Sequence, residues 1–364
     1  INGGLNTFLY NLIHDNIKKN QIELICNKKF NLDKSLKKKI IIHRFNFKED
    51  KNKFFKYLFS IKKILKFVKI LEKIKNKKFL VVNGGHPGSI NSILAIIAWK
   101  IKKKNAKIIY NFHNLASKAN YKNFIIHLFS NFVIFLFTAK VITVSKAALK
   151  SIDNLFLLKK IKKKFIFNGS IDLAIHNNYK KKNNKKYFLI LASYEKRKGI
   201  QIALDAFNSL CEKHDDYHLY VCGDKNGGYY KSLKKQASNL KYKARIKLYP
   251  FVKNKINLLN QCEVLLLPSI SYESFGYTLI EAMSLSKIVM ASNVGGIPEV
   301  VKNKKNGYIF QSNNSKKLLE LFMFFIKEKI SKKNNIKKNA RLTYLKVFNS
   351  KKMTNKYVNE INLL

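Results

Sequence analysis

Arginine, glycine, proline and acidic residues are all scarce in this 364-residue chain. There are 14 Gly and 4 Pro, only four of the 72 basic residues are arginine, and Asp and Glu together number 21, so the formal net charge is +51. Arg, Gly and Pro depend on G/C-rich codons, whereas the abundant Lys, Asn and Ile have A/T-rich codons. Codon bias therefore explains much of the charge. A basic balance usually suggests a nucleic-acid or membrane partner, but here the charge alone establishes neither.

Cysteine is equally rare, and its spacing excludes two kinds of site. The four cysteines, Cys26, Cys211, Cys222 and Cys262, are far apart and form no C-x-x-C pair. A disulfide framework and a cysteine zinc site both need more regular spacing. The pattern predicts reduced, mostly buried thiols in a cytoplasmic protein.

No apolar run is long and clean enough to cross a bilayer, which needs about 20 apolar residues. The nearest is 124–139 (FIIHLFSNFVIFLFTA), which His127, Ser130 and Asn131 interrupt. We predict a helix of the protein core here, with a helix that touches a membrane surface as the alternative.

Apolar residues are nevertheless plentiful, at 46% hydrophobic and 13% aromatic, which excludes a disordered basic tail. The length favours two domains, at about 100–200 residues each. Strand-like runs alternate with helical patterns such as 61–75, 200–213 and 315–330, which indicates α/β architecture with parallel sheets covered on both faces. The strand-like runs are 21–27, 39–45, 79–83, 107–113, 140–145, 187–193, 217–223, 246–250, 263–269 and 287–292.

The polar segment 177–186 (NNYKKKNNKK) is the best linker candidate and divides the chain into two comparable α/β halves. Ligands of open α/β sheets bind in the crevice at the carboxyl ends of the strands. Two such halves facing each other across a cleft would place a substrate between them.

The richest stretch for chemistry runs from 262 to 310. A buried strand precedes Glu273, Gly276 breaks the chain before a helix that starts near Tyr277 or Thr278, and Glu281 lies one turn inside it. The first N–H groups of such a helix form a ready anion site, suited to phosphate. On spacing alone, however, two glutamates are more often a solvated loop residue and a helix-surface charge.

The wider context resembles the retaining glycosyltransferase family 4, whose members have the two-Rossmann GT-B fold. The second half carries the family's pattern of a Glu, seven residues and a Glu, followed by Gly-Gly-x-Pro-Glu at 295–299, Asn-Gly at 306–307 and Lys-Gly at 198–199. The first half matches more loosely, through Gly-Gly at 3–4, a His at a strand end and Asn-Gly at 168–169. The resemblance covers essentially the full chain.

The resemblance implies roles for the charged residues. Lys198 would neutralise the donor's diphosphate, and Arg197 is the candidate replacement for the family's strand-end Arg, because Ser193 stands at that position. Glu273 would lie by the donor sugar, and Glu281 would bind the ribose hydroxyls.

It also implies backbone contacts. The N–H groups of Phe275, Gly276, Tyr277 and Thr278 would cap the sugar and phosphates, and the segment that ends at Val252 would hold the nucleotide base. Gly3 and Gly4 would let a first-domain loop approach the donor phosphate or the acceptor closely, since neither has a Cβ. His113 would touch the donor sugar or position the acceptor, although a lone strand-end His is as often structural.

The implied reaction is transfer of a sugar from a nucleotide diphosphate sugar to a hydroxyl of a glycan or lipid-linked acceptor, with the anomeric configuration retained. Surface polysaccharide or lipopolysaccharide synthesis is the family default.

We expect no metal and no cofactor, because no D-x-D site is evident, and no nucleic-acid partner. The expected location is the cytoplasm, or the cytoplasmic face of the inner membrane if the basic helix near 61–75 contacts anionic lipid.

Three alternatives stay open. A nucleotide-sugar epimerase shares the two-domain architecture, and a basic membrane- or nucleic-acid-binding protein would explain the charge but not the order of the motifs. A two-carboxylate hydrolase is not one of the three, since it fits poorly with Glu281 behind a phosphate-type loop. The third is an inactive fragment, because the first domain lacks the strand that normally precedes the Gly-Gly turn, so we expect an N-terminal truncation.

The expected domains are 1–170, 171–346 and a helix at 347–364 that crosses back to the first domain.

Overall fold

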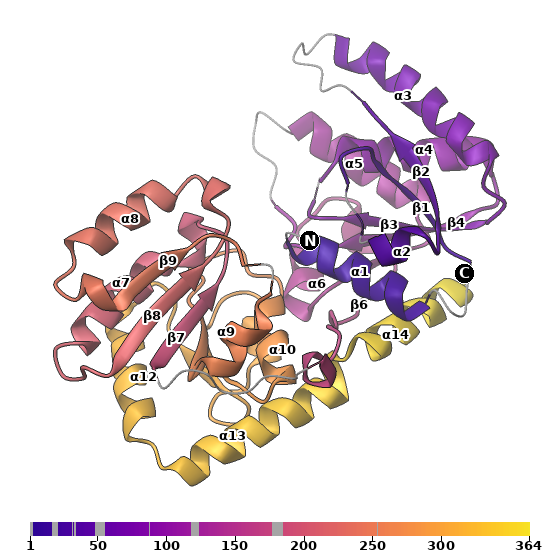
Figure 1. The fold of residues 1–364 in the computed structure, drawn as a ribbon. Helices are drawn as coiled ribbons and strands as arrows, with labels where there is room; N and C mark the ends of the chain where they lie inside the picture. The colour runs from indigo at the N-terminus through magenta and orange to yellow at the C-terminus, as the bar shows by residue number, and fades with distance from the viewer. Residues whose placement is uncertain are drawn as a thin grey trace. The chain divides into compact units, whose positions relative to one another are not determined.

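A computed structural model of the chain describes residues 3–16, 21–30, 32, 34–47, 55–86, 88–117, 124–176, 185–252 and 254–364. The chain forms two compact units (Figure 1). Unit 1 contains Ile1–Gly169 and Ser350–Leu364, and unit 2 contains Ser170–Asn349. Each unit is an α/β structure built on parallel strands, as the alternating sequence pattern predicts.

Unit 2 is built on a six-stranded parallel sheet with the order β12-β11-β10-β7-β8-β9. The chain adds β8 and β9 on one side of β7, then returns to add β10, β11 and β12 on the other side. The boundary between β7 and β10 is therefore the switch point of this sheet. The strands are β7 Lys186–Leu191, β8 Tyr217–Cys222, β9 Ile246–Tyr249, β10 Val264–Leu267, β11 Ile288–Ser292 and β12 Tyr308–Phe310.

The helices α7 and α12 bury apolar stripes in the core of this unit. In α7, the buried Ile200, Ala203, Leu204 and Phe207 recur at helical spacing. Phe188 of β7 lies at the centre of the core and stacks on Phe322, with ring centroids 4.4 Å apart. The helices are α7 Ile200–Leu210, α8 Tyr230–Asn239, α9 Ile256–Gln261, α10 Tyr277–Ser284, α11 Ile297–Val300, α12 Ser315–Lys327 and α13 Ile330–Thr343. Short turns of helix are η2 Leu173–His176, η3 Lys196–Lys198, η4 Lys225–Gly227, η5 Lys243–Arg245 and the π-helical η6 Tyr344–Phe348.

Unit 1 contains two parallel sheets, one with the order β1-β2 and one with the order β3-β4-β5-β6. Among the described residues no strand ladder joins the two sheets. The strands are β1 Glu23–Asn27, β2 Ile41–Phe45, β3 Lys78–Asn83, β4 Lys107–Phe112, β5 Lys140–Thr143 and β6 Lys163–Phe165.

The core of unit 1 lies between its larger sheet and the helices α3 and α4. Trp99, the single tryptophan, is buried and stacks on Phe79 with ring centroids 4.5 Å apart. The helices are α1 Gly4–Asn16, α2 Lys34–Lys37, α3 Phe55–Glu72, α4 Ile90–Lys102, α5 Phe124–Phe137, α6 Lys146–Ile152, the short η1 Leu158–Lys160 and the C-terminal α14 Ser350–Asn362.

Helix α14 is part of unit 1 although it follows unit 2 in the sequence. Tyr357 is buried, and its hydroxyl accepts a hydrogen bond of 2.7 Å from the amide of Asn111 on β4. The nearly buried Glu360 pairs with Lys140 and, at 2.7 Å, with Lys164. These contacts attach the last helix to the strands of the larger sheet.

The ten strand-like runs of the sequence are all strands in the structure, and the buried, free state expected of the cysteines is confirmed. Two short strands, β6 and β12, were missed because three residues give too little periodicity to recognise. The helix expected at 315–330 is confirmed as α12, although it ends three residues early at Lys327 and a separate helix α13 begins at Ile330. Most of the expected linker, 177–184, lies outside the described residues.

The expectation for 124–139 needs the largest correction. The helix forms, as α5, but it is not a helix enclosed by the core. Its polar residues His127, Ser130 and Asn131 are buried, and most of its large apolar residues are exposed. No helix in the described part of the chain is long and apolar enough to cross a bilayer.

Candidate active site

The candidate site of unit 2 lies where the neighbouring strands β7 and β10 end. Parallel neighbours place their carboxyl ends at the same edge of the sheet, so the loops that follow β7 and β10 meet there. The loop after β7 carries Arg197 and Lys198, and the loop after β10 carries Glu273. Residues 75 positions apart in the sequence are thereby brought into contact.

A left-handed glycine allows the first of these loops to approach the second closely. Gly199 follows the turn η3 with φ +67°, and a Cβ at this position would lie 1.9 Å from the carbonyl oxygen of Pro268 at the end of β10. No side chain fits there, which gives the Lys-Gly pair of the sequence a structural reason. The next residue, Ile200, begins α7.

Glu273 lies in a tight, nearly buried loop. Its side chain accepts a hydrogen bond of 3.2 Å from Ser269, and the preceding residue Tyr272 has the strained left-handed φ of 53°. The Gly-Gly turn after β11 packs on its backbone, because Gly296 N–H donates to the Glu273 carbonyl at 2.9 Å. A Cβ on Gly295 would lie 2.1 Å from that same oxygen, so the two loops fix each other.

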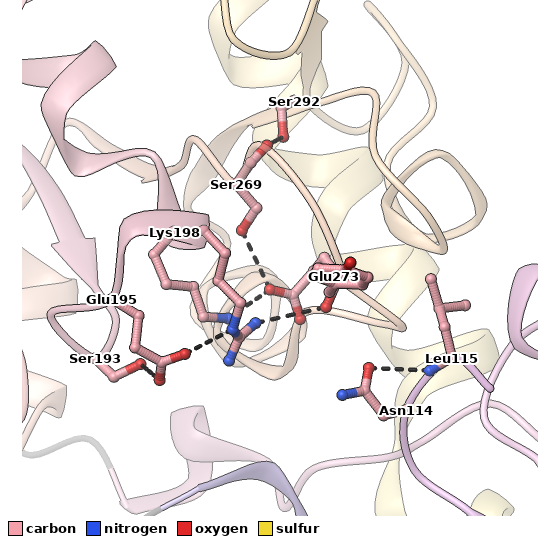
Figure 2. Close-up of polar contacts among 10 residues, drawn as sticks. Asn114, Leu115, Ser193, Glu195, Lys198, Ser269, Glu273 and Ser292 are labelled. Atoms are coloured by element: carbon pink, nitrogen blue, oxygen red, sulfur yellow. Dashed lines mark hydrogen bonds and ion pairs between the residues drawn. The ribbon is translucent and has the colours of Figure 1, made fainter. Parts of the chain in front are cut away.

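Lys198 and Glu273 form an ion pair with Nζ and Oε2 2.6 Å apart (Figure 2). Both side chains are largely buried, so the pair is screened less by water than a surface pair would be. Arg197, one residue earlier, pairs with Glu195 at 2.6 Å, and its Nη1 lies 3.5 Å from the carbonyl oxygen of Tyr272. Two cations from the loop after β7 therefore lie against the loop that carries Glu273.

Glu195 links Arg197 to Ser193, the residue at the position where the family's strand-end Arg would stand. Ser193 donates to its Oε1 at 2.5 Å, and Arg197 donates to its Oε2 (Figure 2). Partial burial pushes the pKa of Glu195 up, but the hydrogen bonds from Ser193 and Arg197 outweigh burial and hold this pKa below its usual range. Glu195 is therefore ionised near neutral pH and holds Arg197.

Helix α10 begins at this loop, as the sequence predicts. Gly276 is its N-cap residue with φ +87°, and Tyr277 and Thr278, both half-buried, form its first turn. The ring of Phe275 is buried and packs edge-on against Phe348, with centroids 5.7 Å apart. The side chain of Phe275 thus belongs to the core, and only its backbone is suited to bind a ligand. The N–H groups of the first turn carry the positive end of the helix dipole.

Glu281 is not a helix-surface charge, since it is only 4% exposed. Its Oε1 accepts from Lys255 Nζ at 2.5 Å, while its Oε2 is buried without a hydrogen-bond partner in the described part of the chain. A buried carboxylate oxygen normally has a donor, so this oxygen is suited to accept from a ligand hydroxyl. Lys255 lies three residues beyond the half-buried Val252, so the ion pair connects the loop after β9 to α10.

The first-unit candidates lie at the ends of β4 and α1. His113 follows β4, is buried, and packs its ring on Phe8 with centroids 4.2 Å apart. Burial lowers the pKa of His113 to about 3, so the imidazole is neutral near pH 7. Gly4 begins α1, and Gly3 has φ +97° with open space where a Cβ would stand. Steric crowding therefore does not require a glycine at position 3.

Three residues of this region were not found from the sequence. Ser269 and Glu195 bond to Glu273 and Arg197, and Lys255 pairs with Glu281. Ser269 ends the predicted strand and Glu195 lies three residues before Lys198, so proximity to a motif was a usable signal for both. No sequence signal pointed to Lys255, because it is one lysine among many and lies 26 positions from its partner Glu281.

The arrangement in unit 2 combines groups of complementary charge. Lys198, Arg197 and the first turn of α10 are suited to an anion such as a diphosphate, and the buried oxygen of Glu281 is suited to a hydroxyl. Among the described residues, no group of three or more His, Cys, Asp or Glu side chains has the arrangement of a metal site.

Comparison with known proteins supports this interpretation. The model of the family "Glycosyl transferases group 1" matches residues 172–343, which lie within unit 2. An uncharacterised glycosyltransferase of Methanocaldococcus jannaschii is 29% identical over 191 residues, which are 50% of this chain and 49% of that protein. The chain spans about half the length of the curated relatives that it matches.

Solved structures match over nearly the whole chain. A glycosyltransferase from Rickettsia africae has a TM-score of 0.80 at 21% identity, covering 98% of this chain and 93% of that one. HepE from Anabaena, in complex with UDP, has a TM-score of 0.77 at 18% identity, covering 100% and 97%. At these identities the likeness shows the fold alone, which is the GT-B fold of two Rossmann-like α/β units.

Proposed function

We propose that this chain, whose residues 172–343 belong to the group 1 glycosyl transferases, moves a sugar from a nucleoside diphosphate sugar to a hydroxyl group of an acceptor. The observation that supports this most directly is the meeting of Lys198 and Glu273 beside the start of α10. Cations and a helix N-terminus suit the diphosphate, and a nearby carboxylate suits the sugar.

In the proposed reaction, the bond from the anomeric carbon to the phosphate oxygen breaks and a bond to the acceptor oxygen forms. The acceptor hydroxyl loses its proton in this step, and the proton leaves with the nucleoside diphosphate. Negative charge grows on the departing diphosphate, and Lys198, Arg197 and the N–H groups at the start of α10 would stabilise it. Stabilisation of charge that develops in the transition state by fixed donors is commonly the largest contribution to catalysis. Glu273 would hold Lys198 in place and contact the donor sugar.

Glu281 would bind the ribose of the donor. Its buried Oε2 lacks a hydrogen-bond donor within the described residues, and a ribose hydroxyl would supply one. Lys255 holds the other oxygen, which fixes the position of the carboxylate for this contact. The loop that ends at Val252 would lie by the base, because Lys255 connects this loop to α10.

We propose further that the transfer retains the anomeric configuration, needs no metal ion, and serves a glycan or lipid-linked acceptor in cell-surface polysaccharide or lipopolysaccharide synthesis at the cytoplasmic side of a membrane. His113, neutral and packed on Phe8, would contact the sugar or the acceptor through its imidazole. Retention would be seen in the anomeric proton coupling of the product, and metal independence in full activity with EDTA.

The decisive experiment is a screen of nucleotide sugars with the full chain. Release of nucleoside diphosphate and the shift in melting temperature are measured for UDP-, GDP-, ADP- and TDP-sugars. We expect one base to give both turnover and stabilisation of several degrees, because a ligand that binds only the folded state stabilises it. If no nucleotide sugar is turned over or stabilises the chain, the proposal is wrong.

A further inference from the structure

We propose that the outer face of helix α5 inserts into the surface of an anionic lipid bilayer. The helix lies beside α4 in unit 1 (Figure 1). This inference goes beyond the proposed sugar transfer and does not depend on it, since it concerns a surface that contains none of the residues assigned to that reaction.

The polarity of α5 is the reverse of that expected for a helix at a protein surface. Its large apolar residues face solvent and its polar residues face the core, although surface helices normally show the opposite pattern. The exposed residues are Phe124, Ile125, Leu128, Phe129, Phe132 and Leu136, and the buried ones are His127, Ser130, Asn131, Val133 and Ile134.

The exposed apolar residues form one continuous face. At about 100° per residue they fall within an arc of about 140° of the helix circumference. We call them the α5 face. The elements α4 and η1 both contact α5, and Ile101 on α4 and Phe156 just before η1 are also exposed. An apolar face of this extent on a soluble surface indicates a binding partner.

The charge around the α5 face indicates which partner. The helix itself carries no charged residue, but exposed lysines lie on or next to the elements that pack against it, including Lys159 and Lys160 of η1 and Lys104 just after α4. An apolar stripe with lysines at its border is the pattern of helices that lie in the headgroup region of anionic membranes.

The length of α5 fits an interfacial orientation. Its 14 residues extend about 21 Å, less than the roughly 30 Å of a bilayer core. The helix therefore lies in the plane of the surface, with its aromatic and aliphatic side chains among the upper acyl chains. The buried polar residues remain packed within unit 1.

A second copy of the chain is a poorer occupant for this face. The formal charge of +51 makes two copies repel each other, and the same charge attracts a negatively charged lipid surface. The positive charge therefore opposes self-association at the α5 face and favours binding of this face to an anionic lipid such as phosphatidylglycerol.

The test compares two double variants of the full chain. The variant Ile125→Ser with Phe132→Ser removes two exposed side chains of the α5 face, 67% and 51% exposed, and the control Ile330→Ser with Leu363→Ser removes two at 75% and 76% elsewhere. Sedimentation with vesicles of phosphatidylcholine and phosphatidylglycerol gives the partition coefficient. We expect the first variant to lower it about tenfold and the control less than twofold, because interfacial binding scales with buried apolar area. Equal effects of the two variants would mean binding by charge alone and would overturn the proposal.

A label on the face gives an independent measurement. The native cysteines are all buried, so Leu128→Cys provides a selective site for a polarity-sensitive fluorophore, with Ile330→Cys as its control. We expect a blue shift at position 128 only when anionic vesicles are added. A blue shift without vesicles would contradict the proposal, and light scattering would then show whether a second copy covers the face. Because sugar transfer is assayed separately on a soluble acceptor, failure here and failure of the proposed function are distinguishable.

Discussion

The two units carry very different residues at the carboxyl ends of their parallel strands. In unit 2, the carboxyl ends of β7 and β10 carry Lys198 and Glu273 as a largely buried ion pair. In unit 1, the carboxyl ends of β3 and β4 are followed by His86 and His113, both buried. The carboxyl ends of neighbouring parallel strands thus carry paired charges in unit 2 and neutral imidazoles in unit 1.

The physical reason is the presence or absence of counter-charges. Burial and, to a smaller extent, the neighbouring His127 lower the pKa of His86 to about 4, and burial lowers that of His113 to about 3. No carboxylate is among the causes of either shift, so burial disfavours the charged form. In unit 2 the buried Glu273 and Glu281 each pair with a lysine, and the buried Asp172 pairs with Arg341. The cations of unit 2 are therefore suited to a charged diphosphate, whereas the two neutral histidines of unit 1 supply no such charge.

The largest effect is expected from removing the central charge of unit 2. Lys198→Gln keeps a hydrogen-bond donor for Glu273 but removes the cation that would stabilise the departing diphosphate. We predict that kcat falls about 10²–10³-fold, the cost of losing one such donor. Steady-state turnover of the donor identified in the screen measures this.

The matched control is Lys196→Gln, which changes an exposed lysine on the same turn η3. It should leave kcat within twofold. Similar losses in both variants would mean that general positive charge near the turn matters, and Lys198 would lose its assigned role.

The second effect is a pH dependence of the protein's stability, which we expect from the neutral histidines of unit 1. The folded pKa of His113, about 3, lies below the unfolded value of about 6.5, so the unfolded state binds more protons between these pH values. The free energy of unfolding should therefore fall as pH falls through this window, by about 1 kcal/mol per pH unit for a buried histidine.

Denaturant unfolding at pH 7, 6 and 5 measures this slope. His113→Gln should make it shallower, and the exposed His14→Gln should not change it. An unchanged slope in His113→Gln would show that this imidazole does not resist protonation, and the contrast between the two units would then be lost.

A third, smaller effect tests the second carboxylate of unit 2. Glu281→Gln keeps the shape of the side chain but weakens its acceptance of a ribose hydroxyl. We predict that KM for the donor rises about tenfold, with a smaller change in kcat, because a bond to a charged acceptor contributes about 1.5 kcal/mol or more. Glu320→Gln, on the exposed surface of α12, is the control. A fall in kcat without a rise in KM would place Glu281 in the chemistry instead of in binding.

The smallest effect is expected at Arg197, which is already paired with Glu195 and is about one-third exposed. Arg197→Gln should raise the donor KM about threefold, because a partly solvated cation contributes little. Isothermal titration with the nucleoside diphosphate measures the same loss directly. A loss as large as that of Lys198→Gln would instead make Arg197 the main phosphate ligand.

Much of unit 2 could be predicted from local sequence. Gly276 before Tyr277 marks the start of α10, and β10 is a continuous apolar run, so the strand, the loop and the helix follow from near neighbours. The position of Glu281 inside α10 was equally clear, but its burial was not, because a glutamate at that spacing is more often on the surface. Unit 1 was less predictable, since α5 is apolar over most of its circumference and its sequence does not show which face it buries.

The sequence by itself therefore determined the order of strands and helices, the free state of the cysteines, and the residues of the motifs, because these depend on periodicity and spacing within a few turns of chain. Only the tertiary structure decided which partner each charge has and which face of α5 meets the core. Lys255 reaches Glu281 across 26 residues, and Lys140 reaches Glu360 across 220. Such contacts form when sheets and helices pack, and the local periodicity of the sequence does not predict them.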